Sequence, residues 1–408
     1  MIRNYVILVV FFLVTLSCKT EKPKNVSLEE DIAFLASDSL IGRETGTPQE
    51  LIAADYLQNR MKNSGLQPKG NAGTYFQTFT FKPKNDPHSE VQFVSGDSTI
   101  TGTNVIGYID NQSSKTVIIG AHYDHLGMGG EGSLYAGGEA VHNGADDNAS
   151  GVGVMLQLAE KLKDSITGSN YLFIAFSGEE MGLLGSNYFS KNPTIDLKNA
   201  NYMINMEMGG RLREDKTLAI SGTGTAPIWN QVLNATNPGF KLVLSESGVG
   251  PSDHTSFYLQ NIPALHFFTG QHEDYHKPSD DAEKLNYEGM KMIGDYILDV
   301  ISELDDDAKL DFRTTKNESE NVPRFKVALG VMPDYLFDGK GMRIDGVTEE
   351  RPAAVAGLQK GDVVIQLGDS TVVDMMSYMR ALSVFEEGNS TKVVVDRKGE
   401  KMEVKVTF

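Results

Sequence analysis

Two segments of this chain carry almost no polar side chains: residues 116–121 (TVIIGA) and residues 171–176 (YLFIAF). A strand with one face in water would alternate polar and apolar residues, so these runs predict strands at the centre of a sheet covered on both faces. Helical patterns at residues 152–163 and 182–190 alternate with these strands and with a third apolar strand at residues 202–206. We therefore expect an α/β fold.

Composition limits the chemistry that such a fold could carry here. The chain has 55 acidic and 37 basic residues and a formal net charge of −18, which argues against a nucleic-acid partner because phosphate binding needs a basic surface. Its one cysteine, Cys18, excludes a disulfide within the chain and zinc sites built from thiolates. A metal would therefore have to be bound by histidine, aspartate and glutamate.

The first 18 residues predict export. Arg3 precedes an apolar run at residues 5–16 that is too short to span a membrane. The sequence Leu-Ser-Cys that ends at Cys18 resembles a bacterial lipobox, so we expect residues 1–18 to be a signal peptide and residues 19–26 a polar tether behind a lipidated Cys18. This predicts a cell-envelope lipoprotein of the outer membrane or periplasm, in contact with the membrane through its anchor only. The alternative is an ordinary secretory signal.

The rest of the chain divides into two parts. A helix is expected at residues 48–63, within a first domain that covers residues 27–304. A charged, polar stretch then predicts an acidic linker at residues 305–323. Residues 324–408 have a β-rich pattern and form the expected second domain.

Acidic and imidazole side chains follow the predicted strands of the first domain. His122 and Asp124 end the first strand, where a period of two puts both on one face. A metal-binding histidine usually donates its second ring N–H to a carboxylate, which Asp124 could supply. Asp147 precedes a helix rich in small residues. Ligands of open α/β sheets bind at the carboxyl ends of strands, so we expect a site here; a structural His–Asp pair and a simple helix cap are the alternatives.

Two adjacent glutamates, Glu179 and Glu180, follow the strand at residues 171–176. Neighbouring carboxylates repel each other and raise one pKa. A dinuclear zinc site would explain the pair, because one glutamate could bind metal while the other accepts a proton from the attacking water; a solvated loop is the alternative. Glu207 closes another strand and His276 lies in a polar loop. Together these side chains suffice for two Zn²⁺ ions with open positions.

The order and context of these motifs resemble the M28 family of zinc aminopeptidases. The motifs are GAHYDHLG, NGADDNASG, FSGEEMGLLGS, NMEMGG, GPSDHTSF and YHKPSDDAEKLN, and the resemblance covers about residues 28–300. It implies a three-layer α/β/α fold with a mixed central sheet. It also implies two zinc ions as cofactors and peptides as substrates.

The resemblance assigns a role to each matching residue. One zinc would be bound by His122, Asp147 and Glu207, and the other by Asp147, Glu180 and His276, with Asp147 bridging the two.

The same resemblance implies roles for two more residues and one feature of the backbone. Glu179 would act as general base and then as general acid, and Asp124 would orient His122. The peptide bond between Asp147 and Asn148 should be cis.

One position departs from the family's pattern. Glu207 stands where the family usually has aspartate, which keeps the ligand chemistry but lengthens the side chain by one methylene. We therefore expect a filled site with adjusted geometry. His254, in GPSDHTSF, resembles a residue that lines the substrate pocket, and it is the candidate substrate-binding residue.

The second domain resembles a bacterial PDZ domain over about residues 324–408. In the protease-associated arrangement the carboxylate-binding loop comes first, which here is the segment with Leu329, Gly330 and Val331. Its N–H groups could bind the C-terminal carboxylate of a peptide while the peptide adds a strand to the sheet. The alternative is a packing module that binds nothing.

These observations predict a co-catalytic dizinc exopeptidase, with an aminopeptidase as the first choice. A carboxypeptidase or dipeptidase on the same fold is the nearest alternative. A single-zinc glutaminyl cyclase and an inactive peptide-binding protein are less favoured, because every predicted metal ligand is present.

Overall fold

The computed structural model describes residues 26–83, 92–130, 132–163, 165–306, 308–316, 326–334, 336–337, 339–348 and 351–408. The predicted signal peptide, Cys18 and nearly all of the predicted tether lie outside these residues, as does much of the predicted linker. Within the described residues, no helix has both the length and the apolar character needed to cross a bilayer.

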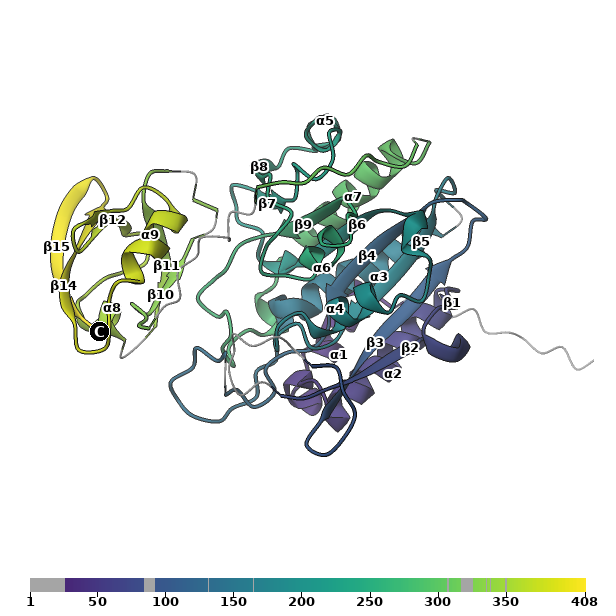
Figure 1. Ribbon diagram of the computed structural model, residues 1–408, viewed down its shortest axis with the longest axis horizontal. Helices are drawn as coiled ribbons and strands as arrows, with labels where there is room; N and C mark the ends of the chain where they lie inside the picture. The colour runs from purple at the N-terminus through teal and green to yellow at the C-terminus, as the bar shows by residue number, and fades with distance from the viewer. Residues whose placement is uncertain are drawn as a thin grey trace, which may run out of the picture.

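A mixed sheet forms the centre of the first domain (Figure 1). The described strands are β1 (Gln67–Pro68), β2 (Phe76–Phe81), β3 (Ile100–Ile109), β4 (Thr116–His122), β5 (Asn170–Phe176), β6 (Ala200–Glu207), β7 (Thr217–Ser221), β8 (Lys241–Ser245) and β9 (Ala264–Phe268). Their order is β1-β3-β5-β4-β6-β9-β7-β8, with β2 on β3. Strands β5, β4, β6 and β9 are parallel neighbours, whereas β3 and β7 run antiparallel to β5 and β9. The expected mixed sheet is confirmed.

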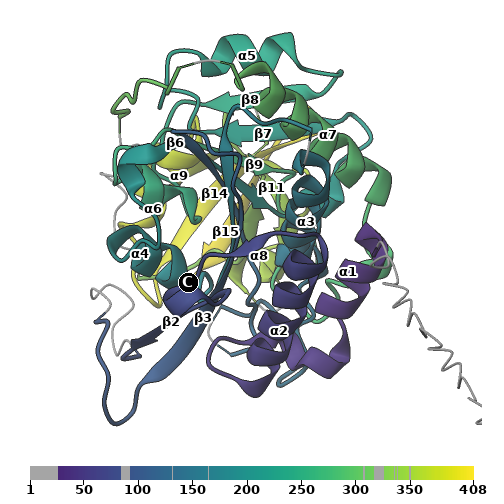
Figure 2. The same cartoon turned by 90° about the vertical axis from the view of Figure 1, so that its right-hand side faces the viewer.

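Helices cover both faces of this sheet (Figure 2). They are α1 (Leu28–Leu35), α2 (Pro48–Asn63), α3 (Gly151–Leu162), α4 (Leu184–Lys191), α5 (Trp229–Ala235), α6 (His254–Tyr258) and α7 (Tyr287–Glu303). Alternate residues of β4 enter different cores: Val117 and Ile119 pack in the cluster that contains α1, α2, α3 and α7, and Ile118 packs with α4 and α6. A strand buried on both faces needs apolar residues at every position, which explains its sequence.

Helix α4 begins later than the predicted segment at residues 182–190. Gly182 and Leu183 have φ values of 104° and 59°, so the chain there is left-handed and the helix starts at Leu184. The sequence pattern therefore located the helix but missed the turn before it.

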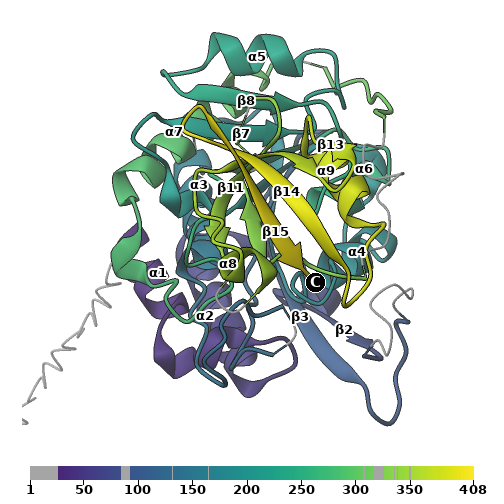
Figure 3. The same ribbon diagram turned by 90° about the vertical axis from the view of Figure 1, so that its left-hand side faces the viewer.

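The second domain has its own antiparallel sheet and its own core (Figure 3). Its elements are β10 (Val331–Pro333), β11 (Met342–Val347), α8 (Pro352–Val355), β12 (Val363–Leu367), β13 (Ser370–Thr371), α9 (Met375–Leu382), β14 (Ser390–Arg397) and β15 (Glu400–Thr407). All strand pairs described in it are antiparallel. This is the small β-rich domain that the sequence predicts.

Ion pairs join the two domains. Arg213, which precedes β7, lies 3.3 Å from a carboxylate oxygen of Asp334 and 3.1 Å from one of Asp345. Lys360 Nζ lies 3.2 Å from Glu273 Oε2. The second domain thus contacts the loop after β9, which also carries His276.

Candidate metal centre

The five predicted metal ligands lie together at the carboxyl ends of the parallel strands. His122 is the last residue of β4 and Glu207 the last of β6. Glu180 follows β5, and His276 lies in the loop after β9. Asp147 comes from the short helical turn η3 (Ala145–Ser150) that leads into α3. Because β5, β4, β6 and β9 are neighbours in the sheet, residues far apart in the sequence meet at one edge.

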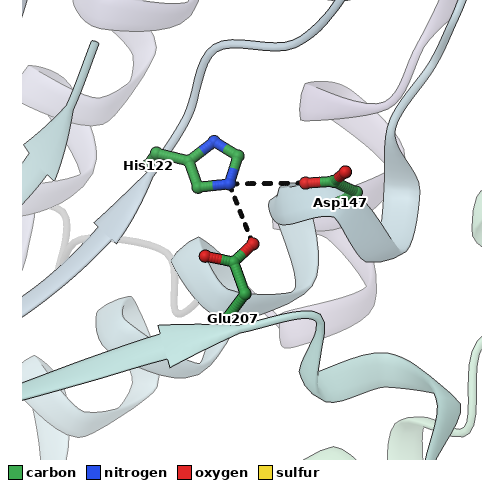
Figure 4. Close-up of side chains that lie close together, drawn as sticks. All are labelled: His122, Asp147 and Glu207. Atoms are coloured by element: carbon green, nitrogen blue, oxygen red, sulfur yellow. Dashed lines mark hydrogen bonds and ion pairs between the residues drawn. The ribbon is translucent and has the colours of Figure 1, made fainter. Parts of the chain in front are cut away.

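The first cluster contains His122, Asp147 and Glu207 (Figure 4). His122 Nε2 lies 2.9 Å from Glu207 Oε1 and 3.3 Å from Asp147 Oδ1. The candidate ligand atoms of all three lie within 4.8 Å of one another. One imidazole and two carboxylates are donors that zinc accepts, so this set fits a zinc ion.

The second cluster uses the other oxygen of Asp147. His276 Nε2 lies 3.2 Å from Asp147 Oδ2 and 3.3 Å from Glu180 Oε2. Asp147 therefore presents one carboxylate oxygen to each cluster, which is the geometry a bridging ligand needs. Its peptide bond to Asn148 is cis, as the resemblance implies.

His125 also lies at this second cluster, although no role for it was predicted from the sequence. Its Nδ1 lies 2.7 Å from Glu180 Oε1, and with Asp147 and Glu180 it forms another group with ligand atoms in metal-binding range. The only sequence signal was its position, three residues after His122. That spacing does not distinguish a histidine at the site from a histidine buried in the core.

The adjacent glutamates differ in the direction of their pKa shifts. Burial, reinforced by the charges of Glu207 and Glu180, raises the pKa of Glu179 well above its usual range. For Glu180, burial acts in the same direction, but the charge of His276 and a hydrogen bond with His125 outweigh it and lower the pKa to about 2. Glu180 is therefore suited to remain an anionic ligand, and Glu179 to hold a proton.

Asp124 does not continue the strand alternation that the sequence suggested. Strand β4 ends at His122, and the N–H of Tyr123 donates to the backbone oxygen of Phe176. His122 Nδ1 lies 3.2 Å from the backbone oxygen of Asp124 and 3.7 Å from its carboxylate. That carboxylate accepts a hydrogen bond of 3.1 Å from the N–H of Glu179. Asp124 thus contacts His122 mainly through its main chain and fixes the segment that carries Glu179.

Arg43 is a buried residue of the site that the sequence analysis missed. It ends the helical turn η1 (Asp38–Arg43) and is 0% exposed. Its guanidinium donates to five backbone oxygens, those of Leu35, Tyr123, Asn143, Gly144 and Asp147. Burial lowers its pKa to about 10. Arg43 therefore ties the segment after β4 to the segment that bears Asp147.

Asp146 and Asp280 fix the bridging residue from the other side. Asp146 accepts hydrogen bonds from the N–H of Gly210, at 2.6 Å, and has His272 Nε2 at 3.1 Å. One oxygen of Asp280 accepts from the N–H groups of Asp146 and Asp147 at 2.9 and 3.0 Å. Asp146 is therefore engaged in loop contacts, which leaves Asp147 as the aspartate that faces both clusters.

Glu207 and His254 differ in how they relate to the site. The second oxygen of Glu207 accepts from Ser252 Oγ at 2.7 Å, which holds the longer side chain in place. His254 is fully buried and stacks on His266, with ring centroids 4.5 Å apart. Burial lowers its pKa well below the usual range. A substrate-binding role for His254 stays a prediction.

Two regions of the chain match known family models. Residues 104–301 match the model of peptidase family M28. Residues 309–408 match that of the PDZ domain. The first domain thus resembles the M28 peptidases in sequence, and its donor set is one that zinc accepts.

Two curated relatives resemble the M28 domain. One is the alkaline phosphatase isozyme conversion protein of Escherichia coli, 30% identical over 218 residues, which cover 48% of this chain and 61% of the relative. The other is the aminopeptidase YwaD of Bacillus subtilis, 29% identical over 217 residues, which cover 50% of this chain and 45% of the relative. The chain thus spans about half of the length of the relatives it matches.

Solved structures share the fold at lower identity. A Zn-dependent exopeptidase from Parabacteroides distasonis has a TM-score of 0.55 at 21% identity, covering 68% of this chain and 97% of that one. A glutaminyl cyclase from Bacteroides thetaiotaomicron has a TM-score of 0.54 at 19% identity, covering 69% and 98%. Proteins with this fold therefore catalyse different reactions, and the function has to be inferred from the residues of the site.

Proposed function

We propose that this protein is a co-catalytic dizinc aminopeptidase that removes N-terminal residues from peptides in the cell envelope. The observation that carries the proposal is the position of Asp147, whose two oxygens lie 3.3 Å from His122 Nε2 and 3.2 Å from His276 Nε2. A carboxylate shared by two imidazoles on opposite sides suits two adjacent metal ions. The nitrogen and oxygen donors present are those that zinc takes in catalytic sites.

The chain supplies ligands for both ions and a separate proton carrier. The ligands would be His122, Asp147 and Glu207 for one ion, and Asp147, Glu180 and His276 for the other. Bound zinc supplies Lewis acidity toward the scissile carbonyl and lowers the pKa of water. Glu179, ionised at the start of the step, would accept the proton of the attacking water and then donate it to the leaving amine. Its raised pKa suits this role.

The charge around the site favours a substrate with a free α-amino group. The site holds two acidic side chains besides the proposed ligands: Glu179, and Asp253, which is fully buried and whose carboxyl oxygens have no hydrogen-bond partner among the described residues. Two bound zinc ions would offset the charge of the ligands themselves. The two acidic groups that are not ligands would, when ionised, attract the ammonium group of an aminopeptidase substrate. The name of the Bacillus relative also supports an aminopeptidase.

The test is hydrolysis of leucine-p-nitroanilide by the purified protein, compared with its N-acetylated form. We expect cleavage of the free substrate only, with loss of activity in a chelator and recovery with zinc. Release of C-terminal residues from N-blocked peptides would favour a carboxypeptidase instead. Cyclisation of an N-terminal glutamine without peptide hydrolysis would favour the glutaminyl cyclase.

We also propose that the protein is exported and anchored through a lipid on Cys18. The support is the apolar run at residues 5–16 and the lipobox-like sequence that ends at Cys18. The wild-type protein should fractionate with membranes, and Cys18→Ser should release it. Wild-type protein found in the soluble periplasmic fraction would contradict the anchor.

A further inference from the structure

A cavity of about 580 Å³ lies between the two domains. On the PDZ side it is lined by the loop at residues 328–331, by Arg351 and by helix α9. Its other wall is residues 133–136, which belong to the M28 domain. The groove that the sequence assigned to the PDZ domain is therefore completed by a loop from the peptidase domain.

The PDZ side of this cavity has the chemistry of a carboxylate site beside an apolar pocket. Gly330 has a φ of 78°, in the left-handed region. The N–H groups of Leu329 and Gly330 donate to no residue in the described part of the chain. Arg351 adds a positive charge over the same loop, where its side chain lies against Gly330. Apolar side chains of α9, Met379 and Leu382 among them, line the rest. This set fits a free C-terminal carboxylate that follows an apolar side chain.

The peptidase wall of the cavity is hydrogen-bonded to His276, a candidate metal ligand. The N–H of Leu134 donates to the backbone oxygen of His276 at 3.0 Å. The ring Nδ1 of His276 lies 2.7 Å from the backbone oxygen of Gly132. Residues 133–136 thus continue directly from the segment that holds the imidazole of His276. A metal-binding histidine is oriented by the group that its second ring nitrogen contacts.

The same wall is fixed from within the M28 domain. Ser133 Oγ lies 2.7 Å from His142 Nε2 and accepts a hydrogen bond of 3.1 Å from the N–H of Tyr135. The side chain of Tyr135 is 44% exposed and lines the cavity. On the far side of the loop after β9, Leu336 of the PDZ domain is buried against Gly270. The PDZ domain therefore contacts the His276 loop directly and shares a cavity with the segment bonded to it.

The PDZ match already implies a groove for the C-terminus of a peptide. We propose that residues 132–136 of the peptidase domain form a second wall of that groove, so that one composite site binds a C-terminal segment with a free carboxylate and an apolar last residue. A bound segment would contact both walls and so stabilise the loop that orients His276. Binding of the peptide itself does not depend on the proposed function; its effect on the metal centre does. Because coupling between two sites is reciprocal, zinc should tighten peptide binding as much as the peptide tightens zinc retention.

The test measures binding of a labelled peptide to the full-length zinc-loaded protein by fluorescence anisotropy. The probe is an octapeptide ending in Ala-Val-Leu with fluorescein on its N-terminus, which blocks the α-amino group that an aminopeptidase needs. We expect the free-carboxylate probe to bind at least about tenfold more tightly than the same peptide with a C-terminal amide. Equal affinity for the two probes, or binding of neither, would refute the carboxylate site.

Variants of the peptidase wall test whether the site is composite. Tyr135→Ala should weaken binding by about fivefold or more, and Ser133→Ala, which removes the hydroxyl that anchors Tyr135, should weaken it in the same direction. Val384→Ala is the matched control, because Val384 is an apolar PDZ residue that is 68% exposed and lies outside the cavity lining. Wild-type affinity in both wall variants would show that the groove belongs to the PDZ domain alone.

Zinc retention tests the link to His276 separately. The carboxylate probe, but not the amide, should slow zinc loss to a chelator in the wild type and less so in Tyr135→Ala. An unchanged rate with a bound probe would overturn the coupling. Peptide binding without any hydrolysis of leucine-p-nitroanilide would overturn the proposed aminopeptidase and leave the composite site in place.

Discussion

Removing the guanidinium of Arg43 should weaken metal binding although no ligand side chain is changed. Arg43 donates to five backbone oxygens, including those of Tyr123, Gly144 and Asp147. Tyr123 follows His122 directly, so the same guanidinium spans the segments that carry two ligands of the first cluster. Arg43→Met would keep most of the side-chain volume and remove every one of these donors.

The loss of stability expected for Arg43→Met follows from the burial of this side chain. Leaving one buried acceptor without a partner costs about 1–3 kcal/mol, and since methionine offers no donor to any of the five oxygens, the total should be at least about 3 kcal/mol. We expect Arg43→Met to lower the free energy of unfolding by about this amount. Arg43→Lys should be intermediate, because an ammonium has three donors and cannot reproduce the planar geometry that reaches five oxygens.

Arg60→Met is the matched control for Arg43→Met. Arg60 is a second buried arginine, but it pairs with Asp31 and Glu160, at 2.6 and 3.0 Å. Its hydrogen bonds in the described part of the chain reach no segment that carries a proposed metal ligand. Urea unfolding should show destabilisation of both variants. Zinc release to a competing chelator and kcat on leucine-p-nitroanilide should change only in the folded Arg43 variant. If folded Arg43→Met retains wild-type zinc affinity and kcat, Arg43 does not position the metal centre.

Three further outcomes are expected. Glu179→Gln should retain zinc while kcat falls about 10²–10⁴-fold, since it removes only the proton carrier; metal analysis showing zinc loss would mean that Glu179 is a ligand. Glu207→Asp should release zinc faster, because the shorter side chain cannot reach both the metal and Ser252 Oγ; chelator competition at wild-type speed would contradict this. Burial alone would raise the pKa of Asp334, but hydrogen bonds from Arg343 and Arg213 outweigh it and lower that pKa. Its stabilising contribution is therefore present above pH 3.8, the ordinary value, and is lost as pH falls through the lowered pKa. The melting temperature of Asp334→Asn should thus lie below that of wild type at pH 7, with the gap closing below pH 3.8; a constant gap would argue against the pair.

The parts of the fold set by local pattern were predictable from the sequence. The helix expected at residues 48–63 is α2 (Pro48–Asn63), where Thr47 accepts from the N–H of Glu50 and proline occupies the first turn. The apolar run at residues 171–176 lies within β5 (Asn170–Phe176). Capping and periodicity involve residues only a few positions apart, so both can be recognised in a single sequence.

The rest of the site depends on contacts between distant segments. Four of the five backbone oxygens that Arg43 contacts lie 80 to 104 positions away, and no local pattern marks a residue whose partners are main-chain groups. His125 lies only three positions after His122, yet the two contact different carboxylates, Glu180 and Glu207. The metal ligands were predicted from the resemblance to a known family. The parallel order of β5, β4, β6 and β9 explains why these ligands lie close together.

The most direct test of the dizinc site is the zinc content of the purified full-length protein, measured by mass spectrometry beside Asp147→Asn. Asp147 contacts both imidazoles, His122 and His276, through separate oxygens. Two zinc ions per chain in the wild type, and loss of metal from both positions in the variant, are the predicted result. One zinc per wild-type chain that still cleaves leucine-p-nitroanilide, or a variant that keeps one ion at full occupancy, would contradict the shared bridging site.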